Sequence, residues 1–396
     1  MLYLAIDQHR KQLTVNMRNE KGDILLKRQV STEWKRVREF FRDVQQQSQA
    51  AGGYVAILEV CGFNNWLLKL LKEYGCRETI LVQPEKRSKK KTDRRDANVL
   101  GEILWVNRER FLAGKRVQGI RRVHEPSERV AENRQITALR VRLGQFHTRI
   151  INKIKHILRK HNLEQECPTK GIQTQAAVQW LRELQLGPID RLEMDQLLAQ
   201  WKLCEEQMGP VEEEIAVRQE RDTATKLLAT IPGGSAYSSL ALASRMDSIE
   251  RFPHRGSLPN YWGLTPGCRN SGQATDRLGS ITKQGSTIAR FILGQWITHV
   301  MRKDPAMKTW YLRIKHRRGA KIARVATMRR LSEIMEEMVK RNQPYVIGGL
   351  PRVTTNSNEL QPSTLKRRTP RSATRKRRPM LTSPREARKT RKGVAS

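Results

Sequence analysis

The chain has 396 residues and a formal net charge of +37, with 76 lysines and arginines against 39 acidic residues. This length supports two or three packed domains, and so large a positive charge points to nucleic acid before anionic membranes or acidic proteins. No apolar run approaches the roughly 20 residues that cross a bilayer, the N-terminus lacks a secretory pattern, and five scattered cysteines form no disulfide or zinc motif. We therefore expect a cytoplasmic, nucleoid-associated protein with no membrane partner.

Alternating apolar residues predict three consecutive strands near residues 2–7, 13–17 and 24–30. A helix is predicted from about Thr32, a strand over 54–60, a helix over 66–75, a strand over 79–82 and a helix from Thr92 or Asp93. The apolar face of the first helix is predicted to comprise Trp34, Val37, Phe40, Phe41 and Val44. The order β-β-β-α-β-α-β-α is that of an α/β ribonuclease-H-like, or RuvC-like, domain, which we place at residues 1–110.

Four acidic residues fall where such a fold gathers side chains at one edge of its sheet. Asp7 lies on the first strand, Glu59 closes the fourth strand, and Asp93 and Asp96 lie three residues apart at the start of a helix. Asp93 and Asp96 are also what the helix dipole alone favours in a first turn. Carboxylate oxygens are the hard ligands that Mg²⁺ or Mn²⁺ prefers. In a strongly basic chain, four of them in this order indicate metal-assisted phosphodiester chemistry.

Long charged helices follow from about Ser127. Apolar residues at spacings of three and four predict two helical segments within 120–222, one from Leu139 to Ile157 and one from Met194 to Ile215. Two antiparallel helices or a dimerising coiled coil would account for both segments. Gly209-Pro210 is expected to kink or restart the second one.

The remaining chain divides into a mainly α region at 223–345 and a basic tail at 351–396. A helix end and turn are expected before Gly234, with helices starting near Ser286 and spanning about 321–340. The tail is rich in Lys, Arg, Ser, Thr and Pro, which predicts disorder and non-specific binding of nucleic acid.

Two basic stretches could contact phosphates, although such runs are often solvated surface. One is the run of lysines and arginine at 86–91, just before Asp93. The other combines cations with aromatic rings, a composition suited to phosphate contact and stacking; it comprises Trp310, Tyr311, Arg313, Lys315, His316, Arg317 and Arg318.

Several motifs, in order and spacing, resemble the DEDD-type insertion-sequence transposases over nearly the whole chain except the tail. These motifs are Ala5-Ile6-Asp7, Leu58-Glu59-Val60-Cys61-Gly62, Lys91-Thr92-Asp93-Arg94-Arg95-Asp96-Ala97, Ile231-Pro232-Gly233, the segment from Tyr261 to Pro266, and the segment from Ile281 to Gly285. The chain departs from that pattern at Gln8-His9, at Gly234-Ser235 and in the length of its tail.

The resemblance implies a function and a further site residue. Such enzymes have a RuvC-like domain, a coiled coil and a C-terminal transposase domain, and resemble serine recombinases guided by an element-encoded RNA. The family's serine corresponds to Ser271, which nothing in the residue pattern alone would have selected. The resemblance thus implies a catalytic set of Asp7, Glu59, Asp93, Asp96 and Ser271, the four acids binding Mg²⁺ or Mn²⁺. The partners implied are DNA, a guide RNA and further copies in a homodimer or tetramer.

Two other functions remain open at this point. A metal-dependent nuclease or Holliday-junction resolvase would use the same acids with water as the nucleophile. A non-catalytic nucleic-acid-binding protein would rely only on the basic tail and loops.

Overall fold

The computed structural model describes residues 1–84, 93–268 and 278–349, and within these ranges the side chains of residues 84, 93–96, 268 and 278 are excluded. Three predicted features therefore lie outside the described residues: the basic run at 86–91, Ser271 and the tail at 351–396. The chain has a mixed α/β N-terminal sheet followed by a mainly helical C-terminal region, as expected.

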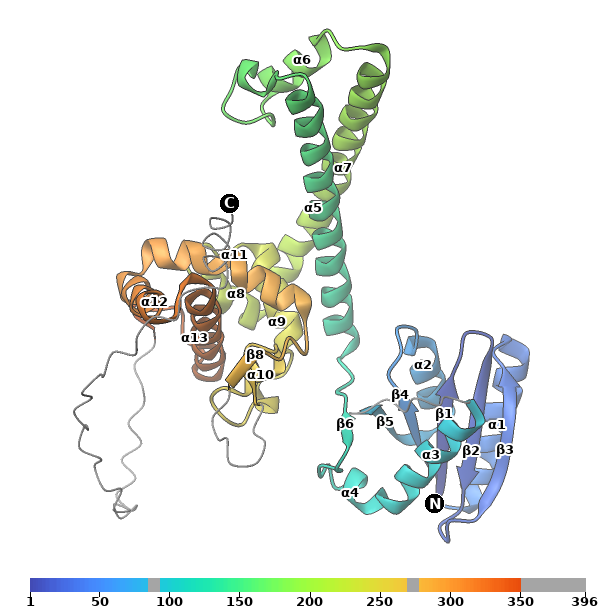
Figure 1. Ribbon diagram of the computed structural model, residues 1–396. Helices are drawn as coiled ribbons and strands as arrows, with labels where there is room; N and C mark the ends of the chain where they lie inside the picture. Colours follow the sequence, from blue (N-terminus) through green and yellow to red (C-terminus); the bar gives the residue numbers. More distant parts are fainter. Residues whose placement is uncertain (85–92, 269–277, 350–396) are drawn as a thin grey trace, which may run out of the picture. The chain divides into compact units, whose positions relative to one another are not determined.

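The N-terminal sheet has six strands in the order β3-β2-β1-β4-β5-β6 (Figure 1). They are β1 (Leu2–Gln8), β2 (Gln12–Arg18), β3 (Ile24–Ser31), β4 (Tyr54–Glu59), β5 (Cys76–Pro84) and β6 (Ile120–Arg122). The first three strands are antiparallel, β4 lies parallel to β1, and β5 lies parallel to β4. This arrangement agrees with the ribonuclease-H-like prediction. The edge strand β6 was not predicted, because three residues are too few to show an alternation.

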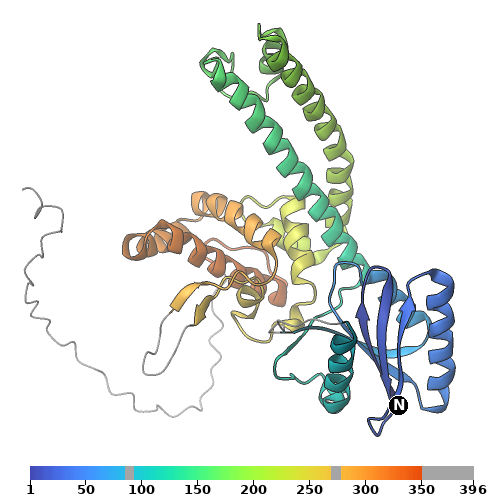
Figure 2. The ribbon, with the colours of Figure 1, turned by 45° about the vertical axis from the view of Figure 1, so that its right-hand side comes forward.

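Helices cover both faces of this sheet (Figure 2). Side chains alternate along β1, so that Leu2, Leu4 and Ile6 join one core and Tyr3 and Ala5 the other. The first core lies under α1 (Trp34–Ala50) and α2 (Asn65–Glu73), and the second under α3 (Asp93–Val106) and α4 (Arg108–Leu112). Both faces of β1 are thus buried.

One residue on the predicted apolar face of α1 is not buried. Trp34 is 56% exposed, while Val37, Phe40, Phe41 and Val44 are buried as predicted. Trp34 is the first residue of the helix, and its ring packs edge-on against that of Trp66 at 5.7 Å. It therefore covers the outside of α2 instead of entering the core.

The middle of the chain is a pair of antiparallel helices, α5 (Glu128–Lys160) and α7 (Pro188–Glu220) (Figure 2). A 3₁₀ turn (Glu164–Glu166) and α6 (Gln175–Glu183) join them. Ion pairs link their opposite ends, Lys160 with Asp190 at 2.8 Å and Arg218 with Glu132 at 3.0 Å. The single chain contains the predicted pair of antiparallel helices, and a dimerising coiled coil stays a prediction.

Two details of this pair differ from the sequence prediction. Leu139 and Phe146 are 37% and 41% exposed, and the first half of α5 instead buries polar side chains such as Thr137, whose Oγ1 accepts from Arg245 Nη1 at 2.9 Å. The second difference is that α7 continues through Pro210 without a restart. The preceding Gly209 has no Cβ to clash with the proline ring.

The C-terminal region packs around its own core, which includes Trp262, Trp296 and Leu331. Its elements are α8 (Thr223–Ala229), α9 (Ala236–Met246), a 3₁₀ turn (Ile249–Arg251), α10 (Ser257–Tyr261), β7 (Pro266–Cys268), β8 (Leu278–Ile281), α11 (Thr287–Lys303), α12 (Pro305–Arg318) and α13 (Ala320–Arg341). Ser286 caps α11, as predicted, by accepting from the backbone N–H of Ala289. Within the described ranges, no helix combines the length and the apolar character needed to span a bilayer.

Candidate active site at the sheet edge

Asp7 and Glu59 lie side by side on the two central strands. Ile6 pairs with Leu58 in the parallel register of β1 and β4, so the next residues, Asp7 and Glu59, occupy neighbouring positions where the strands end. Adjacent strands are about 4.8 Å apart, and residues at matching positions share a face. Asp7 lies two residues after Ala5, and Glu59 lies two residues after Ile57. Their side chains therefore project on the same face of the sheet as Ala5 and Ile57, which is the face that α3 covers.

Helix α3 runs antiparallel to β1 across this face. A Cβ on Gly101 would lie 3.5 Å from the Cβ of Ala5, while Trp105, one turn later, donates to the carbonyl of Glu20 beyond the start of β1. Asp7 lies two residues past Ala5, about 6.6 Å along the strand, which corresponds to about four residues of helix. The backbone of α3 near residue 97 is therefore level with Asp7. The backbone of Asp96 is therefore at about this level, and that of Asp93 lies about one helical turn beyond it.

The end of β1 also braces the turn that follows Glu59. Asn64 Nδ2 donates to Gln8 Oε1 at 2.8 Å and to the carbonyl of Glu59 at 3.3 Å, and Asn64 Oδ1 accepts from the Cys61 N–H at 2.6 Å. Gln8 Nε2 completes the set by donating to the carbonyl of Phe63 at 3.1 Å. Gln8 and Asn64 are buried, 8% and 5% exposed. This network fixes the backbone of Glu59 relative to Asp7.

Sequence reasoning missed the roles of Gln8 and His9, which appeared only as departures from the family pattern. His9 Nε2 lies 2.9 Å from Asp7 Oδ2, and the Asp7 side chain is 14% exposed. The sequence does not indicate this contact, because pairing between residues two apart depends on how the chain leaves the strand. Buried glutamine and asparagine leave no periodic signal either.

Three of the predicted site residues have no described side chain: Asp93, Asp96 and Ser271. Ser271 falls in the segment that joins β7 to β8. Among the side chains that are described, no three His, Cys, Asp or Glu residues gather as a metal site. The structure therefore brings Asp7 and Glu59 together and sets the helix start that carries Asp93 and Asp96 above them.

Two glycines hold the base of the β7–β8 hairpin. Gly263 and Gly285 have φ of +71° and +78°, and a Cβ on them would lie 2.1 Å from the carbonyl oxygen of Gln284 and 2.0 Å from that of Tyr261. The two segments are joined by the Lys283 N–H, which donates to the Gly263 carbonyl at 3.2 Å. Only residues without a side chain allow this approach. The base of the β7–β8 hairpin is thus anchored by tight backbone packing.

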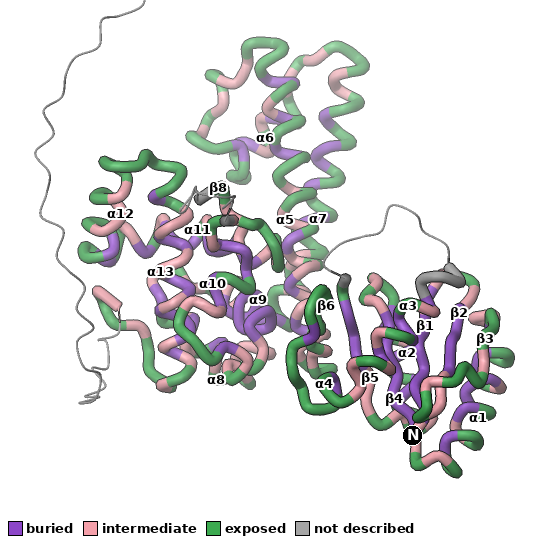
Figure 3. The backbone as a smooth tube through the Cα atoms, turned by 60° about the horizontal axis from the view of Figure 1, so that its bottom comes forward, coloured by how far each residue is buried: buried purple, intermediate pink, exposed green. Residues whose placement is uncertain are grey.

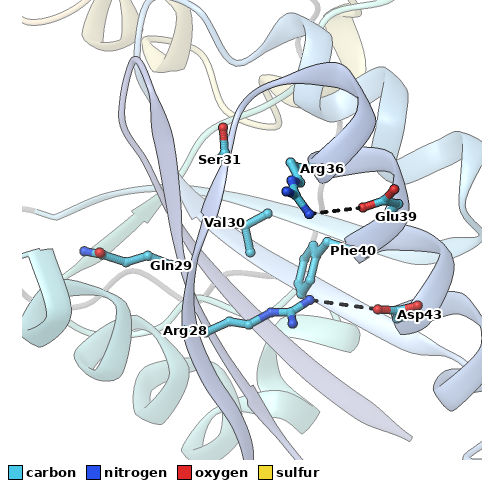
Figure 4. A pocket seen from close by; sticks show the side chains of 8 residues that line it. All are labelled: Arg28, Gln29, Val30, Ser31, Arg36, Glu39, Phe40 and Asp43. Carbon is cyan, nitrogen blue, oxygen red and sulfur yellow. Dashed lines mark ion pairs between the residues drawn. The ribbon is translucent and has the colours of Figure 1, made fainter.

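A cavity of about 370 Å³ lies elsewhere, between β3 and α1 (Figure 4). Arg28 of β3 pairs across it with Asp43 of α1 at 3.9 Å, and Arg36 pairs with Glu39 along α1 at 4.0 Å. Arg28 also lies over the ring of Phe40 at 5.0 Å. The cavity contains none of the predicted site residues and is on the α1 side of the sheet, so we do not assign it to the candidate site.

Comparison with known proteins identifies the family. A family model described as Transposase, of the DEDD type found in IS110, matches residues 4–163, and the model described as Transposase IS116/IS110/IS902 family matches residues 225–312. The chain is also similar to the transposase for insertion sequence element IS1111A of Coxiella burnetii, with 24% identity over 301 residues, which cover 74% of this chain and 79% of that relative. The two models account for both the sheet region and the helical region. The chain therefore belongs to the IS110 family and is a DNA transposase of the DEDD type.

Proposed function

We propose that this transposase breaks and rejoins DNA strands with a carboxylate metal site and a serine nucleophile. Asp7, Glu59, Asp93 and Asp96 are the proposed metal ligands, and Ser271 is the proposed nucleophile. The observation that carries the proposal is the register of β1 and β4, which sets Asp7 beside Glu59 beneath the start of α3.

The carboxylates fit a divalent cation on chemical grounds. Two like charges on neighbouring strands repel each other unless a cation or proton lies between them. Their oxygens are hard donors of the kind that Mg²⁺ and Mn²⁺ take, and IS110-type DEDD enzymes are in general dependent on divalent metals. When bound, the cation would lower the cost of forming an alkoxide and would offset charge on the phosphate oxygens. The identity of the ion, Mg²⁺ or Mn²⁺, is part of this proposal.

The protein's own part of the reaction is a reversible ester exchange. The Ser271 oxygen forms a bond to phosphorus as one bridging oxygen of the DNA leaves; the serine proton departs, and the leaving deoxyribose oxygen takes up a proton. The number of phosphoester bonds is conserved, so the reverse step rejoins a strand without another energy source. His9, hydrogen-bonded to Asp7, keeps that carboxylate oriented at the edge of the sheet.

The wider organisation is proposed on the same basis. We propose a RuvC-like domain at 1–110, a coiled-coil dimerisation region at 120–222, a transposase domain at 223–345 and a disordered basic tail at 351–396. A homodimer or tetramer would let Ser271 of one copy meet the acids of another. An element-encoded guide RNA is the proposed source of target choice. These points rest on the family and not on the packing of one chain.

Covalent capture of DNA tests the proposal. A nicked duplex incubated with protein and Mg²⁺ should give a protein–DNA adduct that survives denaturing electrophoresis, and Ser271→Ala should abolish it. Ser280→Ala is the matched control, since Ser280 is exposed on β8 of the same hairpin. Adducts that persist in Ser271→Ala would remove this serine from the mechanism.

The acids need a control of their own. Glu59→Gln should abolish adduct formation without changing DNA affinity, whereas Glu73→Gln, at the exposed end of α2, should leave both unchanged. Cleaved DNA with free hydrolysed ends and no adduct would instead indicate water as the nucleophile. Unchanged adduct yield in Glu59→Gln would contradict the metal site.

A further inference from the structure

The charged residues of helix α12 and of the start of α13 are all cationic. Residues 305–332 include no aspartate or glutamate but nine lysines and arginines. We define the α12 basic face as the exposed lysines and arginines between residues 308 and 321, before and after the Gly319 turn: Lys308, Arg313, Lys315, Arg317, Arg318 and Lys321. Figure 3 shows α12 as largely exposed along its length.

Packing does not require these cations. Met307 is buried and Trp310, Tyr311 and Ile314 are half-buried, which is the i, i+3, i+4, i+7 pattern of a single inward face. The basic residues occupy the rest of the helix. Replacing any of these cations with a neutral residue would remove no contact with the core.

Among the described residues, these cations also lack ion-pair partners. In the described ranges, no carboxylate forms an ion pair with any member of the α12 basic face, whereas further along α13 Arg329 pairs with Glu333 at 3.2 Å and Lys340 with Glu336 at 2.6 Å. A favourable interaction with the helix dipole explains cations in the last turn of α12. This interaction explains only one or two of the six. Arg313 and Arg317 at i, i+4, and Lys315 and Arg318 at i, i+3, repel each other. Such unrelieved repulsion is removed when a polyanion binds.

The aromatic rings of this region are only partly exposed. Trp310 is covered by the guanidinium of Arg330, 5.0 Å from the ring centroid, and Tyr311 lies on the inward face. Single-stranded nucleic acid is usually held by exposed aromatic platforms within a basic groove. A helix with many cations and no free ring is better suited to the phosphate backbone of a duplex. Base stacking by Trp310 and Tyr311 stays a prediction from the sequence.

We propose that the α12 basic face binds the phosphate backbone of duplex DNA. The inference rests on the protein being a DNA transposase and is independent of the acids and Ser271. Binding at this face holds the duplex without reading its sequence, because exposed lysines and arginines contact phosphates irrespective of the bases. It leaves the choice of target to other parts of the complex.

Salt-dependent binding tests the proposal. Affinity for a fluorescent duplex of arbitrary sequence is measured by anisotropy over a range of salt concentrations, with EDTA present so that no cleavage occurs. In the variant Arg313→Gln/Lys315→Gln/Arg317→Gln/Arg318→Gln, the slope of log affinity against log salt should fall in magnitude by about 3 to 4, since each phosphate contact contributes about 0.9. The fall should be the same for unrelated sequences.

Two controls separate this from a loss of net charge or of folding. Lys35→Gln/Arg36→Gln/Arg38→Gln/Arg42→Gln removes the same charge from exposed positions of α1 and should leave the slope nearly unchanged. The variant Arg313→Lys/Arg317→Lys/Arg318→Lys keeps the charge and should retain wild-type binding. Circular dichroism verifies folding, and the milder Arg313→Gln/Arg317→Gln, with a predicted fall of about 2, serves if the fourfold variant is unstable.

Three results would overturn the proposal: an equal fall for the α1 variant, an unchanged slope for the α12 variant, or a fall confined to structured RNA with duplex DNA binding intact. The α12 variants leave Ser271 and the acids unchanged. If the α12 basic face proved not to bind DNA, the covalent-capture test of the proposed function would still be valid, and failure of covalent capture would likewise leave the binding proposal intact.

Discussion

Replacing Gly101 by alanine should disturb the seating of α3 on the sheet. A Cβ at this position would lie 2.6 Å from Oδ1 and 3.1 Å from Cγ of Asn16, against normal contacts of about 3.5 Å or more between carbons. Asn16 is fully buried, and its Nδ2 donates to Asn98 Oδ1 at 2.9 Å. The amide cannot turn away without losing this bond, so α3 must rise by several tenths of an ångström.

The magnitudes predict little net change in stability but a clear loss of activity. Alanine in a helix interior is favoured over glycine by about 1 kcal/mol, and overpacking a buried contact costs about 1–3 kcal/mol. The variant should therefore be between neutral and about 2 kcal/mol less stable. Because α3 carries Asp93 and Asp96, and a misplacement of about 1 Å can cost about a hundredfold in rate, covalent capture of DNA should fall more than tenfold.

Gly294 provides the matched control. It is also a helix-interior glycine, in α11, and a Cβ there would meet only Arg324 Nη2 at 3.9 Å. Gly294→Ala should gain up to about 1 kcal/mol, with capture unchanged. Urea denaturation measures stability, and the capture assay measures activity. The reasoning is refuted if Gly101→Ala is as stable as Gly294→Ala and equally active.

Three further predictions concern the supports of the site and of the helical region. Asn64→Ala should cost about 1–3 kcal/mol, because it leaves the Cys61 N–H without its partner, and should lower capture but not DNA affinity; unchanged capture would show that the turn after Glu59 needs no brace. Gly263→Ala should destabilise the β7–β8 hairpin and abolish capture, since its Cβ would meet the Gln284 carbonyl at 2.1 Å; a stable, active variant would contradict the anchoring role. Burial raises the pKa of Asp304, but hydrogen bonds from Tyr345 and from the N–H groups of Met307 and Gly348 outweigh it and hold the pKa below its usual value. The contribution of these bonds is present above the ordinary carboxyl pKa and is lost as pH falls through the lowered one. Tyr345→Phe should therefore be about 1.5–3 kcal/mol less stable at neutral pH, with the difference shrinking below about pH 4; a difference independent of pH would rule out the charge on Asp304 as its cause.

The sheet and its helices could be predicted because their signals are local and repeated. Leu2, Leu4 and Ile6 alternate with period two, and Val37, Phe40, Phe41 and Val44 recur at helical spacing, so each element shows its own pattern. Trp34 fits the same pattern and is nevertheless exposed, because it lies at the helix end, where the core has already stopped.

The site was predictable only in part. The placement of Asp7 and Glu59 on strand ends follows from the pattern, and their adjacency follows from the strand order. The Gln8–Asn64 network could not be foreseen, since it joins residues 56 positions apart through amide groups that carry no periodicity. The inward face of α12 was also missed, because the abundance of cations masks the spacing of Met307, Trp310, Tyr311 and Ile314.

The central claim, that acids from three separate elements share divalent cations at the sheet edge, is tested most directly by anomalous diffraction from crystals soaked in Mn²⁺. We predict an anomalous peak within about 2.0–2.4 Å of carboxylate oxygens of Asp7 and Glu59, with Asp93 or Asp96 completing the ligands. A well-ordered edge without a peak, or Mn²⁺ bound only to unrelated surface carboxylates, would contradict the account.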